Sequence, residues 1–160
     1  MKLLFIGDVV GNPGRRGLAE TMPRLKERYE PDLIVVNGEN SAGGMGITEK
    51  TAKDIFETGA DVITLGNHTY RHRDAYEYLD RAKRVIRPAN YRRSNPGTGV
   101  CRFEKAGVRI AVINLSGTVG LTAARSPFDE IDLILADIEG ETDVRIVDFH
   151  AEVTSEKVAL

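Results

Sequence analysis

The sequence predicts an α/β fold built on a parallel sheet, and three observations lead to this prediction. Apolar runs alternate with helical patterns over residues 3–65 in the order β-α-β-α-β, which is typical of parallel strands joined by right-handed crossovers. The runs at 3–6, 33–36 and 61–65 are almost continuously apolar, as expected for strands buried on both faces. Polar side chains follow four of the predicted strands, and the carboxyl ends of strands are where active sites collect in α/β sheets.

The first helix follows the strand at 3–6, which we expect to be central in the sheet because its apolar run is unbroken. Gly11, Pro13 and Gly14 predict a loop before this helix. The helical spacing then continues to about Tyr29, and Pro23 is expected to kink or divide it.

The second helix is marked at both ends. Thr48 is a suitable N-cap residue, and Gly59 is suited to the position just after the helix. The segment 37–46, which precedes it, contains four glycines and predicts a loop that can approach a ligand closely.

The second half of the chain predicts further elements in order. We expect a short helix at 74–83, a brief strand at 85–86 and an antiparallel hairpin at 99–115 that turns at 105–107. A loop without clear periodicity follows at 116–124.

The last elements begin at Ser126, which with Pro127 and Asp129 forms a good helix start. The final predicted strand covers 144–149 and is followed by His150. Thr154 then begins another helical pattern shortly before the sequence stops. We therefore expect residues 1–160 to be the N-terminal part of a longer domain.

The composition excludes few functions but narrows the class of protein. The 160 residues are 41% hydrophobic and 29% charged, with a net charge of −2, which suits one globular domain and gives no general reason to expect nucleic-acid binding. The single cysteine, Cys101, cannot form an internal disulfide. No apolar stretch reaches the length of a signal peptide or a membrane span. These features predict a cytoplasmic protein that does not enter a membrane.

The polar residues at the strand ends are of metal-ligand type: Asp8, Glu39, Asn40, Asn67, His68 and His150. Glu39 could bridge two metals, Asp8 could bind one of them and His150 the other, and the two asparagines could each supply an amide oxygen. This mixture of oxygen and nitrogen donors suits iron, manganese or zinc better than calcium. Two such metals about 3.5–4 Å apart can hold a bridging hydroxide and support phosphoryl displacement. His68 would then be free to donate a proton to the leaving group.

Each of these residues also has a simpler interpretation. Asp8 alone suits a loop or helix cap, Glu39 a solvated charge, and the asparagines turn positions with left-handed backbone. His150 could be a histidine satisfied by hydrogen bonds at a strand end. The metal-site interpretation depends on all of them occurring together at four strand ends.

A second feature is a cluster of basic residues between positions 71 and 93. This cluster is either a solvated face or a rim that attracts an anionic substrate. If the cluster is such a rim, a rival function stays open. The protein would then be a non-catalytic module that binds a nucleotide or RNA and has an incomplete metal site. The eight residues are Arg71, Arg73, Arg81, Lys83, Arg84, Arg87, Arg92 and Arg93.

Four motifs resemble those of the calcineurin-like metallophosphoesterases, and most closely those of their bacterial YmdB-like branch. Val10 and Glu39 stand where most of that superfamily has a histidine and an aspartate, and both departures are typical of the branch. The motifs are Gly7-Asp8-Val9-Val10-Gly11, Asn37-Gly38-Glu39-Asn40, Gly66-Asn67-His68-Thr69 and Asp148-Phe149-His150-Ala151-Glu152.

The resemblance implies a four-layer α/β/β/α fold and a site for two metal ions, often iron. It implies that Asp8, Glu39 and Asn40 serve one metal, that Glu39, Asn67 and His150 serve the other, and that His68 is the proton donor. The implied activity is hydrolysis of 2′,3′- or 3′,5′-cyclic nucleotides by a homo-oligomer. The family continues into a Gly-Thr-His-Thr-His motif that this sequence lacks, so we expect the C-terminal strands and one histidine ligand of each metal to be missing here.

Overall fold

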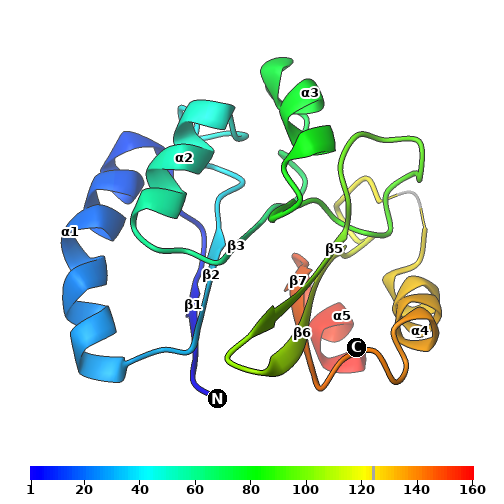
Figure 1. The fold of residues 1–160 in the computed structure, drawn as a ribbon. Helices are drawn as coiled ribbons and strands as arrows, with labels where there is room; N and C mark the ends of the chain where they lie inside the picture. The colour runs from blue at the N-terminus through cyan, green and yellow to red at the C-terminus, as the bar shows by residue number, and fades with distance from the viewer. Residues whose placement is uncertain (124) are drawn as a thin grey trace.

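The computed structural model describes residues 1–123 and 125–160 and shows four layers in the order α/β/β/α (Figure 1). The first sheet contains four parallel strands in the spatial order β1-β2-β3-β4. Neighbours in this sheet are also neighbours along the chain, joined by helices, which confirms the predicted parallel α/β organisation. The strands are β1 (Leu3–Ile6), β2 (Leu33–Asn37), β3 (Val62–Thr64) and β4 (Val85–Ile86).

Three helices follow the strands of this sheet, and their apolar faces share one core with it. Leu18 and Met22 of the first helix and Ile55 of the second pack in a cluster with Ile34 and Ile63 of the sheet. Spacings of three and four residues put such side chains on one face of a helix, which explains why this face is buried. The helices are α1 (Gly11–Tyr29), α2 (Glu49–Glu57) and α3 (Asp74–Arg81).

The second sheet covers the opposite face of the first. Its strands are β5 (Val100–Lys105), β6 (Val108–Ser116) and β7 (Val144–His150), in the order β5-β6-β7. The predicted hairpin at 99–115 is confirmed, because β5 and β6 are antiparallel, whereas β7 runs parallel to β6.

Two apolar clusters join these layers. Val35 and Val62 of the first sheet pack against Cys101 and Val112 of the second. On the outer face of the second sheet, Ile138 packs in a cluster with strand residues of β6, and Figure 1 shows α4 (Pro127–Asp137) as the outer layer there. The chain ends with α5 (Thr154–Ala159), at the predicted helix start.

The strand β1 corrects one expectation. It lies at the edge of the sheet rather than in its centre, and Leu3 and Phe5 are 43% and 39% exposed. Leu4 and Ile6 pack against the helical layer, whereas the apolar cluster between the two sheets does not include Leu3 or Phe5. An unbroken apolar run therefore did not distinguish an edge strand from a central one.

The start of α1 corrects another expectation. The predicted loop at Gly11, Pro13 and Gly14 is already helical. Pro13 is tolerated because the first turn of a helix contains N–H groups without intrahelical partners. Gly11 has φ +56° and donates its N–H to the carbonyl of Asn40 at 2.8 Å, so this glycine allows the turn from β1 into the helix.

Pro23 does not divide the helix, since α1 continues from Gly11 to Tyr29. Met22, directly before the proline, is 1% exposed, and Leu18 one turn earlier is 5% exposed. Burial of these side chains against the sheet compensates for the missing backbone hydrogen bond.

Most predicted element boundaries agree with the structure. The Thr48 side chain accepts from the backbone of Thr51, and Gly59 has φ +97° after the end of α2. The expected loop at 116–124 begins one residue late, because Ser116 is still in β6, and it includes Ala124, which lies outside the described residues. In the described ranges, no helix is long and apolar enough to cross a membrane.

Candidate functional site

The six predicted site residues lie together where four strands end. Asp8 follows β1, Glu39 and Asn40 follow β2, Asn67 and His68 follow β3, and His150 is the last residue of β7. Contacts between their side chains connect all six. The fold therefore brings together residues that lie far apart in the sequence, from Asp8 near its start to His150 near its end.

The carboxylate of Glu39 is the centre of this cluster. Its side chain is 3% exposed, and its Oε1 lies 3.6 Å from His68 Nδ1 and 3.5 Å from His150 Nε2. Its Oε2 accepts the backbone N–H of His68 at 3.1 Å. A buried carboxylate is unfavourable without positive charge or several hydrogen bonds. The two imidazoles around the Glu39 carboxylate therefore indicate a functional site.

The amide of Asn40 joins Asp8 to His68. Its Nδ2 donates to Asp8 Oδ1 at 2.7 Å, and its Oδ1 lies 2.6 Å from His68 Nδ1. An ionised carboxylate only accepts hydrogen bonds, which fixes the amide nitrogen on the side of Asp8. The amide oxygen then accepts from His68, so the proton of a neutral imidazole lies on Nδ1, and Nε2 has no hydrogen-bond partner within the described residues. The His68 side chain is 27% exposed.

Asn67 and His150 form a second pair. Asn67 Oδ1 lies 2.8 Å from His150 Nε2, and because an amide oxygen only accepts, the imidazole donates here. The His150 side chain is 22% exposed. Adjacent residues of one turn, Asn67 and His68, thus contact different partners.

Gly66 belongs to the motif Gly66-Asn67-His68-Thr69 but was not one of the expected metal ligands. A Cβ at this position would lie 2.3 Å from Glu39 Oε2 and 2.7 Å from His150 Nδ1. The absence of a side chain therefore lets β3 approach both groups. The sequence signal for this role was a glycine at the end of a buried strand, directly before two polar residues.

Two further polar residues support the cluster from behind. Asn37 Oδ1 accepts the backbone N–H of Glu39 at 3.3 Å, and Asn37 Nδ2 lies 3.5 Å from Asp148 Oδ2. Burial raises the pKa of Asp148 above its ordinary value, and the hydrogen bond from Asn37 opposes this shift. Both residues belong to the recognised motifs, so the sequence contained a signal for them.

Asn114 was not among the expected site residues. This residue is fully buried in β6, and its Nδ2 donates to the carbonyl of Leu65 at 2.6 Å and to that of Ile86 at 3.1 Å. It therefore fixes the end of β3, directly before Gly66, against the second sheet. Only the tertiary fold brings these segments together.

The donor set fits a metal centre in chemical type. The first expected set, Asp8, Glu39 and Asn40, is connected by contacts of 2.7 and 3.4 Å. The second set, Glu39, Asn67 and His150, is connected by contacts of 2.8 and 3.5 Å. Each set combines side-chain oxygens, and in one case a nitrogen, around the same buried carboxylate. These atoms are suitable donors for divalent transition metals.

Each set also contains an asparagine. Accordingly, no three His, Cys, Asp or Glu side chains among residues 1–123 and 125–160 are placed to hold a metal by themselves. The amide oxygens accept from imidazoles in this arrangement, so binding a metal through them requires those contacts to open.

The basic cluster between positions 71 and 93 does not form one uniform surface. Arg81 is paired with Glu49, Arg84 lies over the Phe56 ring at 5.2 Å, and Arg87 is 5% exposed. The expectation of a solvated face is therefore wrong for Arg87, whereas the alternative of a rim that attracts an anionic substrate stays a prediction.

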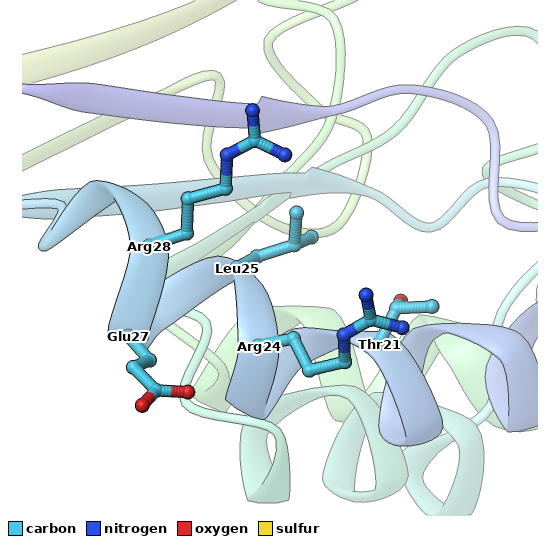
Figure 2. A pocket seen from close by; sticks show the side chains of 5 residues that line it. All are labelled: Thr21, Arg24, Leu25, Glu27 and Arg28. Carbon is cyan, nitrogen blue, oxygen red and sulfur yellow. The ribbon is translucent and has the colours of Figure 1, made fainter.

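A hollow of about 360 Å³ lies elsewhere, on α1. Figure 2 shows the side chains that line it, and all of them come from this one helix. None of the six site residues lines this hollow, so it does not belong to the site. The lining residues are Thr21, Arg24, Leu25, Glu27 and Arg28.

Comparison with known proteins agrees with the fold. A 2′,3′-cyclic-nucleotide 2′-phosphodiesterase of Bacillus subtilis (strain 168) is 43% identical over 160 residues, which is 100% of this chain and 61% of that protein. A crystal structure described as a novel phosphatase of Mycoplasma pneumoniae has a TM-score of 0.89 at 35% identity, covering 99% of this chain and 58% of that chain.

The NAD nucleotidase of Haemophilus influenzae is more distant. It has a TM-score of 0.66 at 13% identity, covering 98% of this chain and 39% of that chain, a likeness that shows the fold alone. The chain spans about 60% of the length of the first two proteins that it matches. Residues 4–160 match the family described as YmdB-like protein. This match and the identity to the Bacillus subtilis protein show that the chain belongs to the YmdB-like protein family.

Proposed function

We propose that this protein is a metal-dependent phosphodiesterase that hydrolyses cyclic nucleotides, either 2′,3′- or 3′,5′-cyclic. The observation that carries the proposal is the convergence of two imidazoles and the Asn40 amide on the buried carboxylate of Glu39, with Asn67 joined to it through His150. The name of the Bacillus subtilis relative supports a cyclic-nucleotide substrate.

In this proposal two metal ions share Glu39. Asp8 and Asn40 would complete the protein ligands of one ion, and Asn67 and His150 those of the other. Iron is the first candidate, with manganese and zinc as alternatives, because the donors combine oxygen and nitrogen. When bound, such ions supply Lewis-acid stabilisation of phosphoryl oxygens and lower the pKa of a water molecule.

His68 would move the proton. Its Nδ1 contacts Asn40, so Nε2 of the imidazolium is the nitrogen left to donate to the leaving oxygen. The contact from Asn40 and the backbone hydrogen bond to Glu39 hold the imidazole in place. Proton donation to a leaving alkoxide suits a phosphodiester, in which the departing oxygen gains negative charge.

The test combines metal analysis with turnover. The purified complete protein is analysed by elemental spectrometry and assayed with bis-p-nitrophenyl phosphate and with 2′,3′- and 3′,5′-cyclic AMP. We expect hydrolysis that a chelator abolishes and that manganese or iron restores. Hydrolysis that persists in the chelator would contradict the metal-dependent mechanism. Size-exclusion chromatography and cell fractionation test the homo-oligomer and the cytoplasmic location that belong to the same proposal.

A second candidate is a nucleotide- or RNA-binding module without turnover. It is favoured by one observation, that every expected metal set within the described residues depends on an asparagine. One firmly bound metal or none, together with nucleotide binding but no hydrolysis, would support this candidate over the enzyme.

A further inference from the structure

Among the residues that the structure describes, Arg87 is a buried cation without an anionic partner. Its side chain belongs to a residue that is 5% exposed, and none of the ion pairs within the described residues includes it. Its Nη1 donates to the carbonyl of Pro88 at 2.8 Å and its Nη2 to that of Asn95 at 3.5 Å.

The remaining guanidinium nitrogen is buried as well. Nε of Arg87 is one of only three buried side-chain polar atoms that have no partner in the part of the chain that the structure describes. A desolvated charge normally has a counter-charge and its donors normally have acceptors. Two carbonyl contacts therefore leave Arg87 both under-bonded and uncompensated.

Arg87 lines an open cavity of about 240 Å³ together with Arg93 and Arg125. The only acidic residue in the lining, as far as the described residues extend, is Glu130, and both of its oxygens are bound by Arg125, at 3.0 and 2.8 Å. Arg125 is thereby neutralised, and Arg87 and Arg93 leave two positive charges in the wall without compensation. The space suffices for a phosphate group and several water molecules, each of which occupies about 30 Å³ in the liquid.

We propose that this cavity is a second ligand site, which binds a phosphate group through Arg87 and Arg93. None of the six residues of the metal site lines it. A phosphate group would supply the missing counter-charge, and planar guanidinium groups match phosphate geometry well. The phosphate could be inorganic or part of a nucleotide, which share this chemistry.

The test uses nuclear magnetic resonance of the arginine Nε–Hε groups in the purified protein. Inorganic phosphate is titrated at constant ionic strength against a chloride control, and the Arg87 signal is assigned by its absence from the spectrum of Arg87→Lys. We expect a saturable shift of the Arg87 Hε signal with phosphate and none with chloride. A parallel titration with 5′-AMP separates the two sources, since tighter binding of 5′-AMP would identify a nucleotide as the ligand.

Two neighbouring arginines provide a matched pair of variants. Arg92 and Arg93 are both exposed, but only Arg93 lines the cavity. Arg93→Gln should weaken phosphate binding by about 10- to 100-fold, the usual value of a hydrogen bond to a charged group, whereas Arg92→Gln should change it little.

An unshifted Arg87 signal at saturating phosphate would overturn the proposal. Equal weakening by Arg92→Gln and Arg93→Gln would also overturn it, because general electrostatic attraction would then explain the binding. Thermal melting of each variant shows whether it is folded. If Arg87→Lys does not fold, the comparison of phosphate binding by the two glutamine variants still decides the question.

Discussion

Asn67 and His68 are adjacent in the chain, but their side chains contact different residues. Asn67 contacts the expected metal ligand His150, whereas His68 contacts Asn40 through Nδ1. We predict that His68→Ala retains bound metal and loses turnover by about 10²- to 10⁴-fold, the usual contribution of a general acid. Asn67→Ala should lower the occupancy of one metal as well as turnover. Elemental analysis of both variants is the measurement, and equal metal loss from the two would refute this division.

Gly66 gives a prediction that depends on space rather than on charge. A Cβ there would collide with Glu39 and His150 at 2.3–2.7 Å, so Gly66→Ala should displace both. We expect lower metal occupancy and a loss of about 1–3 kcal/mol in the free energy of unfolding, which is typical of overpacking.

The matched control for Gly66→Ala is Gly7→Ala. Gly7 lies directly after β1, its backbone is not left-handed, and a Cβ added to it would meet no described atom within 4 Å. Metal content and urea unfolding are measured for both variants. A Gly7→Ala variant that loses as much metal as Gly66→Ala would show that the steric explanation is wrong.

At the scale of elements, α2 depends on a defined N-terminal cap. The Thr48 side chain accepts the Thr51 backbone N–H at 3.3 Å, and the Thr51 hydroxyl accepts the Thr48 N–H at 3.0 Å. We predict that Thr48→Ala lowers the free energy of unfolding by about 1 kcal/mol. Thr21→Ala is the control, because Thr21 is exposed inside α1 and alanine is the better helix former. Chemical denaturation of both variants tests this, and an equal effect would speak against the cap.

The elements differ in how far the sequence determines them. The strand ends that carry Asp8 and Glu39 were predictable, since each follows a run of apolar residues, and His150 follows a strand rich in β-branched residues. The start of α1 was not, because glycine and proline also favour loops and only the hydrogen bond from Gly11 to the β2 loop distinguishes the two cases. The edge position of β1 was not predictable either, as it depends on the order in which the strands pair, with β2 as the neighbour of β1.

The same limit applies to the candidate site. The ligand-type residues could be identified from their motifs, but the contacts of Asn114 to Leu65 and Ile86 could not, because they join two sheets. The isolation of Arg87 was equally hidden, since a sequence shows a cluster of charges and not which of them is buried.

At the scale of the whole molecule, Cys101 reports on the contact between the two sheets. It is 4% exposed and packs in the cluster that joins them. We predict that the folded protein reacts with an aromatic disulfide reagent only when the sheets open, because a buried, protonated thiol is a poor nucleophile. The rate is compared without and with urea. Fast reaction of the folded protein would show that the sheets separate easily.

The same thiol predicts how stability depends on pH. Burial raises the pKa of Cys101 from 9.0 to about 11, so the folded thiol keeps its proton after the unfolded thiol has lost it. The unfolded state therefore gains relative stability as the pH rises from about 9 to about 11, and the thiol has no such effect at lower pH. Cys101→Ala removes this contribution. We expect the wild type to lose on the order of 1–2 kcal/mol more than this variant between about pH 8 and pH 10.5, since one pKa unit corresponds to 1.36 kcal/mol. Urea unfolding of both proteins across this range is the measurement, and the difference between them cancels the titration of tyrosines and lysines that both share.

Parallel curves would mean that Cys101 ionises as readily in the folded protein as in the unfolded chain, and that the layer between the sheets is open to water.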